Sequence, residues 1–203
     1  MNEEISPILE PKTEKSTPNW FDKENLKSIG KEVLIFSLIG LILPFRMYVA
    51  EPYLVDGRSM DPTFSTGDYL IVDKLSYNFT APKRNSVVVF KAVDADQSNK
   101  SFIKRIIGLP GETVIIKDNT VQIINSENPN GFMVDQSYVV HGATGNYQKT
   151  LAGDEYFVMG DNRAESYDSR YWGPLNKKYI SGKPILRLLP IGSIDISPGA
   201  DTK

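Results

Sequence analysis

The sequence predicts a mainly β protein: an antiparallel β-sheet domain with a smaller β insertion, preceded by a single transmembrane helix. Three observations support this fold class: an apolar run near the N-terminus, a series of short segments rich in Val, Ile, Tyr and Phe after it, and a hairpin signal near the middle of the chain. The 203 residues suit one domain with appendages and are enough to bury an active site.

Residues 1–28 are mostly polar, with Pro7, Pro11 and Pro18 among Glu, Lys, Ser and Thr. A segment of this composition cannot bury enough apolar surface to offset the entropy that it loses on ordering. We therefore expect a flexible tail over residues 1–28.

An apolar run follows the tail and predicts a transmembrane anchor over residues 29–49. The run reaches the length of a span only if Arg46 snorkels outward and Tyr48 lies at the membrane interface. A buried core helix is one alternative, which the lack of a polar face over residues 33–45 disfavours. A cleaved secretory signal is a second alternative, but its charged leader would be too long and no small residue stands at the third position before a cut at Ala50.

Positive charges are distributed unequally about this anchor. Lys23, Lys27 and Lys31 precede its apolar run, which begins at Val33, and only Arg46 stands at the far end. Because cytoplasmic flanks carry an excess of Lys and Arg, the sequence predicts a cytoplasmic N-terminal tail and a body on the exported side of the membrane.

The rest of the chain, residues 50–203, is predicted to form the main folded domain, and it is there that we look for an active site. Its short apolar segments are bounded by Gly, Pro, Asn and Asp, and the clearest predicted strands are 69–74, 86–90, 102–107 and 155–159. Two further strands, 113–117 and 120–124, flank Asp118 and Asn119, which tolerate the positive φ of a tight turn. Residues 119–153 are rich in Asn, Gly and Ser beyond this hairpin, and we expect a looser insertion there.

Composition argues against several classes of function. The formal net charge is −2 and the pI about 5.5, so nothing suggests the basic surface that nucleic-acid binding needs. The chain has no cysteine and one histidine, His141, which argues against thiol chemistry, a Ser-His-Asp triad and the usual zinc sites. We expect neither a metal nor an organic cofactor.

Ser59 is the candidate nucleophile, because it stands between the flexible Gly57 and the turn-forming Pro62. A serine hydroxyl needs a base, and lysine remains once histidine is set aside. A free lysine is protonated at pH 7, whereas burial can lower its pKa by roughly 3–5 units and leave it neutral.

Lys104 is the candidate base, because it lies within an apolar segment that ends at a Gly-Pro-Gly turn. Phe102, Lys104 and Ile106 would point to one face of a strand, and Ile103 and Arg105 to the other. The alternative is an edge strand whose charged residues only face solvent.

Residues 160–170 crowd charges and hydroxyls around one turn, which in isolation could be a solvated loop. Together with Ser59 and Lys104, this stretch offers Ser166 as a hydrogen-bond partner for a catalytic lysine. Asp161 and Asp168 could fix nearby arginines.

These stretches resemble the type I signal peptidases, membrane-anchored serine proteases that remove signal peptides from exported proteins with a Ser/Lys dyad. The family pattern Ser-Met-x-Pro-Thr stands at residues 59–63 and Lys-Arg-x-x-Gly-x-Pro-Gly at 104–111, and further matches stand at 67–74 and 160–170. The resemblance covers most of residues 53–189.

The resemblance implies a role for each site residue. Ser59 would be the nucleophile, Lys104 the general base and Ser166 a group hydrogen-bonded near the lysine amine. Two ion pairs would orient the site, Asp161 with Arg105 and Asp168 with Arg170. Family substrates carry small residues at the first and third positions before the cut, and the residues at positions matching the shallow substrate pockets are Tyr53, Val55, Met60, Phe64, Phe102 and Ile103, which could equally be ordinary core.

The chain departs from the family at Gly57, where some members have a serine that donates to the oxyanion. A donor from elsewhere, or water, would then support the Ser59 backbone N–H. Asn85 and Ser86 also replace a Gly-Asp pair at a turn away from the dyad.

The sequence thus predicts a membrane-bound endopeptidase that acts on signal peptides of exported preproteins at a plasma (inner) or thylakoid membrane. Its partners would be those signal peptides and the lipid bilayer, with no nucleic acid and no metal. A self-cleaving repressor-type Ser/Lys protease is one rival, but this chain has a span where the DNA-binding domain would be. A catalytically silent membrane-anchored β module is the other, and the intact Ser59, Lys104 and Ser166 argue against it.

Overall fold

The computed structural model describes residues 23–92, 100–118, 120–139 and 145–199. Most of the predicted flexible tail, residues 1–22, lies outside the described residues. The chain divides into two compact units, residues 1–43 and 44–203.

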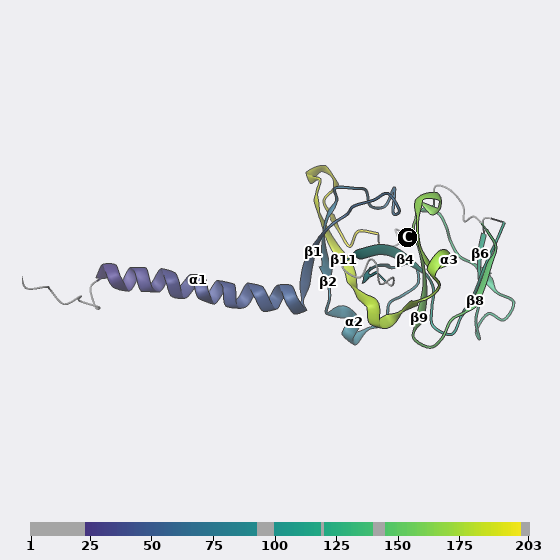
Figure 1. Ribbon diagram of the computed structural model, residues 1–203, viewed down its shortest axis with the longest axis horizontal. Coiled ribbons are helices and arrows are strands. Elements are labelled where there is room, and N and C mark those ends of the chain that lie inside the picture. The colour runs from purple at the N-terminus through teal and green to yellow at the C-terminus, as the bar shows by residue number, and fades with distance from the viewer. Residues whose placement is uncertain (1–22, 93–99, 119, 140–144, 200–203) are drawn as a thin grey trace, which may run out of the picture. The chain divides into compact units, whose positions relative to one another are not determined.

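Helix α1 (Lys23–Tyr48) is the predicted anchor (Figure 1). It begins six residues before the expected start at residue 29, because the polar residues 23–28 include good helix formers and extend the first turns. Within it, Lys27–Arg46 has a mean hydropathy of 1.8 over 20 residues, and none of these residues is buried. A core helix would be buried, so the apolar face of α1 fits an anchor better than the core-helix alternative.

The second unit, residues 44–203, contains an eight-stranded antiparallel sheet in the order β1-β2-β11-β3-β4-β9-β10, with β12 paired to β11. The predicted strands correspond to β2, β3, β4 and β9 to within a residue or so at each end. The bounds are β1 (Ala50–Leu54), β2 (Tyr69–Asp73), β3 (Val87–Lys91), β4 (Ser101–Gly108), β9 (Glu155–Met159), β10 (Leu175–Asn176), β11 (Ile180–Leu189) and β12 (Asp195–Ile196). Short helical turns connect them: α2 (Ser76–Phe79), η2 (Arg163–Glu165), α3 (Ser169–Trp172), η3 (Lys177–Tyr179) and η4 (Ile191–Ser193).

A second sheet has four strands in the order β7-β6-β5-β8. The predicted hairpin forms its centre, with β5 (Thr113–Lys117) paired to β6 (Thr120–Ile124) and Asp118 at a φ of 51° in the turn. Two segments of the expected looser insertion add the outer strands, β7 (Phe132–Met133) and β8 (Tyr147–Thr150). The insertion is therefore more regular than its composition suggested. In Figure 1, β6 and β8 lie beyond β9 as seen from β1 and β2.

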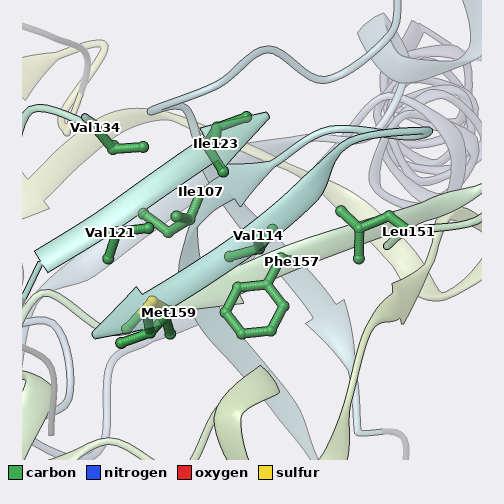
Figure 2. Close-up of a cluster of buried hydrophobic side chains, with 9 residues drawn as sticks. Ile107, Val114, Val121, Ile123, Val134, Leu151, Phe157 and Met159 are labelled. Atoms are coloured by element: carbon green, nitrogen blue, oxygen red, sulfur yellow. The ribbon is translucent and has the colours of Figure 1, made fainter. Parts of the chain in front are cut away.

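A shared apolar cluster joins the two sheets. Figure 2 shows side chains of the second sheet, among them Val114, Val121 and Ile123, packed with Phe157 and Met159 of β9. All of these are buried, and Ile107 of β4 belongs to the same cluster. Because interiors are close-packed, the second sheet and strands β4 and β9 support one another.

Candidate active site

The side chains of Ser59 and Lys104 are in direct contact. Ser59 lies in the loop between β1 and β2, and Lys104 lies in the middle of β4. The Lys104 amine donates a hydrogen bond of 2.6 Å to Ser59 Oγ and another of 3.0 Å to the carbonyl oxygen of Ile103. A hydroxyl and an amine at this distance can exchange a proton directly.

Lys104 is buried, with 3% of its surface exposed. Burial lowers the pKa of Lys104 from 10.5 to about 8, because the charged amine loses its water. The carboxylates of Asp168 and Asp161 oppose this shift, and the charge of Arg170 adds to it. A substantial part of the amine is therefore neutral at slightly alkaline pH, as a general base requires.

The loop that carries Ser59 is fixed at both ends. Gly57 has a φ of 113°, in the region that favours glycine, and it exchanges two hydrogen bonds of 3.1 Å with the Thr66 hydroxyl. On the other side, the backbone N–H of Asn162 donates to the Ser59 carbonyl oxygen at 3.0 Å. The Asn162 side chain also donates to the carbonyl oxygen of Arg58 at 3.1 Å.

Gly160 allows this close approach of backbone to backbone. A Cβ at that position would lie 2.4 Å from both the Ser59 carbonyl oxygen and Ser166 Oγ. Only glycine leaves room for the nucleophile loop against the residues that follow β9.

Arg105 and Asp161 form a buried bidentate ion pair. Arg105 Nε donates to Asp161 Oδ1 at 2.9 Å, and Arg105 Nη2 donates to Oδ2 at 2.7 Å. The Thr63 hydroxyl donates to Oδ2 of the same carboxylate at 2.6 Å. Thr63 is four residues past Ser59, so this network ties the nucleophile segment to β4 and to the end of β9.

Arg170 and Asp168 form a second pair, with bonds of 2.8 Å from Nε to Oδ1 and 2.9 Å from Nη2 to Oδ2. The Ser166 hydroxyl donates to Asp168 Oδ2 at 2.6 Å and accepts from the Gly160 N–H at 3.2 Å. The proton of Ser166 thus goes to Asp168, and its contact with the Lys104 amine stays a prediction.

A small cavity of about 60 Å³ opens beside the dyad. Tyr53, Val55, Phe102 and Ile103 line it, as do Ser59 and Lys104 themselves; the remaining lining residues are Leu54, Asp56, Leu70, Val89 and Ser101. The predicted pocket residues Met60 and Phe64 are not among its lining. They are buried in a core cluster with Val55 and Leu70, and so lie behind the cavity wall.

Several residues near the site escaped the reasoning from sequence. Asn162, Thr63 and Thr66 stand inside or beside the motifs, so a count of hydrogen-bonding groups in those motifs could have identified them. Leu70 and Val89 also line the cavity, but in the sequence they look like ordinary buried residues of predicted strands. Gln136 and Tyr138, which contact catalytic-domain arginines, fall in the expected looser insertion, where no signal marked them.

The arrangement supplies a hydroxyl nucleophile, a buried amine to take its proton and a small cavity, lined by both polar and apolar residues, for a side chain of the substrate. Such a set fits acyl transfer at a peptide carbonyl. It needs no metal-ligating group for that step.

The comparisons with known proteins agree with this chemistry. A family model described as "Signal peptidase, peptidase S26" matches residues 27–189. The "Signal peptidase I" of Leptolyngbya laminosa is 36% identical over 179 residues, covering 84% of this chain and 81% of that protein. The "Signal peptidase I V" of Bacillus subtilis is 40% identical over 153 residues, covering 71% of this chain and 89% of that one. A crystal structure of a signal peptidase I from Enterococcus faecalis shares 29% identity with a TM-score of 0.43, covering 51% of this chain and 97% of that one.

Proposed function

Because the chain belongs to the signal peptidase I family (peptidase S26), serine endopeptidases that cleave signal peptides from exported preproteins with a Ser/Lys dyad, we propose that Ser59 is its nucleophile and Lys104 its general base. The observation that carries the assignment is the 2.6 Å contact between Ser59 Oγ and the buried Lys104 amine.

The first half of the reaction forms an acyl-enzyme. Neutral Lys104 accepts the Ser59 proton as Oγ attacks the carbonyl carbon of the scissile bond. The tetrahedral intermediate collapses, the C–N bond breaks, and the ammonium of Lys104 gives the proton to the leaving amine. The signal peptide stays on Ser59 as an ester, and the mature chain departs.

In the second half, Lys104 takes a proton from a water molecule, and the resulting hydroxide attacks the ester carbonyl. The C–O bond to Ser59 breaks, and the proton returns to Oγ. The Ser59 backbone N–H is the expected oxyanion donor in both halves. Gly57 offers no hydroxyl and its own N–H donates to Thr66, so water or a donor from elsewhere would supply the second hydrogen bond.

The supporting residues hold this geometry. Asp161 with Arg105 would fix the nucleophile segment through Thr63, and Asp168 with Arg170 would fix the turn that carries Ser166. Asp161 and Asp168 would act by positioning groups and through their charge, since each carboxylate is bound to an arginine and is not available as a base.

The cavity favours a small side chain before the cut. Its volume of about 60 Å³ accommodates alanine more readily than a large residue. Tyr53, Val55, Phe102 and Ile103 would contact the substrate, whereas Met60 and Phe64 would support the wall from behind.

The anchor places the enzyme in the bilayer that holds its substrate, and tethering raises the effective substrate concentration. Lys27 and Lys31, which precede the apolar run that begins at Val33, favour a cytoplasmic tail and a catalytic body on the exported side. The chain has no cysteine, so single cysteines can report the orientation. In intact cells, a membrane-impermeant maleimide should label a Lys117→Cys variant and spare a Ser16→Cys variant; the reverse pattern would contradict the orientation.

Trapping the ester tests the assignment of the nucleophile. A preprotein with alanine before its cut is mixed with enzyme, quenched in acid after milliseconds and digested for mass spectrometry. The peptide that contains Ser59 should carry the mass of the signal-peptide acyl group. An adduct on another residue, or the same adduct in a Ser59→Ala variant, would overturn it.

A further inference from the structure

A short segment after β7 connects the second sheet to two arginines near the dyad, Arg105 and Arg163. It begins at Val134, whose N–H donates to the Val121 carbonyl oxygen at 2.9 Å and whose side chain is buried in the shared apolar cluster. Figure 2 shows Val134 beside the second sheet. The start of the segment is therefore held by the sheet.

Two side chains further along this segment reach the catalytic body. Gln136 Oε1 accepts a hydrogen bond of 2.5 Å from Nη1 of the buried Arg163. The ring of Tyr138 lies over the guanidinium of Arg105, with 4.1 Å between Arg105 Cζ and the ring centroid. At this distance the ring quadrupole attracts the cation.

Arg105 has no in-plane donor to spare. Besides its two bonds to Asp161, Nη1 donates to the carbonyl oxygens of Asn85 at 2.7 Å and Gly199 at 2.8 Å, and Nη2 also donates to the Thr63 hydroxyl at 3.4 Å. The faces of the planar guanidinium are what remain, and Tyr138 covers one of them. The ring keeps water from that face and limits rotation of the guanidinium out of the plane of the carboxylate.

The state of Arg105 matters for the base, because Arg105 binds Asp161, one of the charged groups that act on the Lys104 amine. The charged groups that act on the Lys104 amine are Asp168, Asp161 and Arg170. A carboxylate near the amine favours the protonated, inactive form. A firmly held Arg105 neutralises Asp161, and that limits its effect on Lys104.

We propose that Tyr138 is a positioning residue of the dyad: its ring holds the Arg105 guanidinium on Asp161 and so helps to keep the Lys104 amine neutral. The proposal rests on the assignment of Lys104 as the base. Through Tyr138, the second sheet would contribute to catalysis as well as to the stability of the fold.

The test compares Tyr138→Leu and Tyr138→Phe in the full-length enzyme. The rate of cleavage of a preprotein, as kcat/KM, is measured from pH 6 to pH 10.5, and the melting temperature is recorded for each variant. Loss of the ring should lower kcat/KM at pH 7.5 about threefold. The acid limb should move up by about half a pH unit or more, so that most of the rate returns near pH 10. Tyr138→Phe keeps the ring and should behave like the parent.

Tyr147→Leu is the matched control. Tyr147 is another ring of the second sheet, and it packs on the shared apolar cluster with its ring centroid 4.9 Å from that of Phe157. Its loss should lower the melting temperature and leave the acid limb where it is. If Tyr138→Leu melts below the assay temperature, Tyr138→Met serves as a second variant without a ring.

Three results would overturn the proposal: an unmoved acid limb without the ring, a rate loss of the same size at every pH, or failure of Tyr138→Phe to restore the profile. Cleavage by Lys104→Ala at the rate of the parent would instead refute the assignment of the base, independently of the results for the Tyr138 variants.

Discussion

The Lys104 amine and the Ser59 hydroxyl are 2.6 Å apart, although 45 residues separate them in the chain. The short distance lets the proton pass without a histidine between the two groups. The amine also donates to the Ile103 carbonyl oxygen, which fixes its direction. Burial makes the amine available as a base near neutral pH, because it lowers the pKa of Lys104 to about 8.

The pH dependence of cleavage follows from this pKa. Only neutral Lys104 can accept the Ser59 proton, so kcat/KM should rise with pH through about 8 and level off above it. A pH–rate profile on a preprotein whose own groups do not titrate in that range measures the limb. An acid limb near 10.5, the value of a free lysine, would show that the base is not buried.

Lys104 should also lower the stability of the fold. Its pKa is lower in the folded than in the unfolded chain, so below pH 8 the folded chain bears the full penalty of a buried charge, which disappears as the pH rises towards 10.5. Lys104→Met should therefore abolish cleavage and raise the free energy of unfolding at pH 7 by about 2 kcal/mol. The gain should shrink at pH 10.5.

Denaturant titration in detergent measures this change. Lys117→Met, at an exposed position, is the control and should shift stability by less than about 0.5 kcal/mol. A loss of stability in Lys104→Met at pH 7 would contradict the expected penalty.

The Arg105–Asp161 pair should be sensitive to loss of one partner. Asp161→Asn removes the carboxylate that balances the buried charge of Arg105, which should destabilise the fold by about 3–5 kcal/mol and reduce activity. The control is Asp195→Asn, because Asp195 is 44% exposed and lies 3.6 Å from Arg187. Its effect should stay below about 1 kcal/mol. Equal melting temperatures for the two variants would refute the structural role of the buried pair.

The width of the cavity should set the substrate preference. Val89 is buried and lines the cavity, so Val89→Ala should enlarge it. The ratio of cleavage rates for a preprotein with valine before the cut, relative to alanine, should rise severalfold in this variant. Val158→Ala, at an equally buried position outside the cavity lining, should leave the ratio unchanged. A rise in both variants would point to general loosening.

Sequence reasoning succeeded where a local signal determines the structure. Strand β9 has the predicted bounds, because its apolar run ends at Gly153 on one side and Gly160 on the other. The hairpin of β5 and β6 was found from its turn, in which Asp118 takes the expected positive φ.

Strand β11 had no such signal, although it is the longest strand of the sheet. Gly182 and Pro184 lie inside it and are typical of strand breaks. In the structure its pairing with β2 and β3 shifts register near these residues, and a Cβ at Gly182 would lie 2.1 Å from the Asp73 carbonyl oxygen. The glycine is needed for close packing of neighbouring strands, which is a long-range requirement.

In the candidate site, too, local motifs predict the residues, whereas long-range packing determines their contacts. The motifs pointed to Ser59 and Lys104, but their contact depends on how the β1–β2 loop lies over β4, and no local pattern gives that. The partner of the Ser166 hydroxyl, which is Asp168, depends on a turn of three residues whose geometry only the structure shows. Tyr138 was invisible because a single ring in a polar segment has no periodicity to reveal its contact.

Ser59 and Lys104 are expected to act as one catalytic unit. Cleavage of a preprotein by variants that each lack one of the two groups tests this most directly. Purified parent, Ser59→Ala and Lys104→Ala enzymes are incubated with a preprotein that has alanine before its cut, after melting curves have shown that all three are folded. The account predicts that each substitution alone lowers the cleavage rate by about a thousandfold or more. Cleavage by either folded variant at the rate of the parent would contradict it.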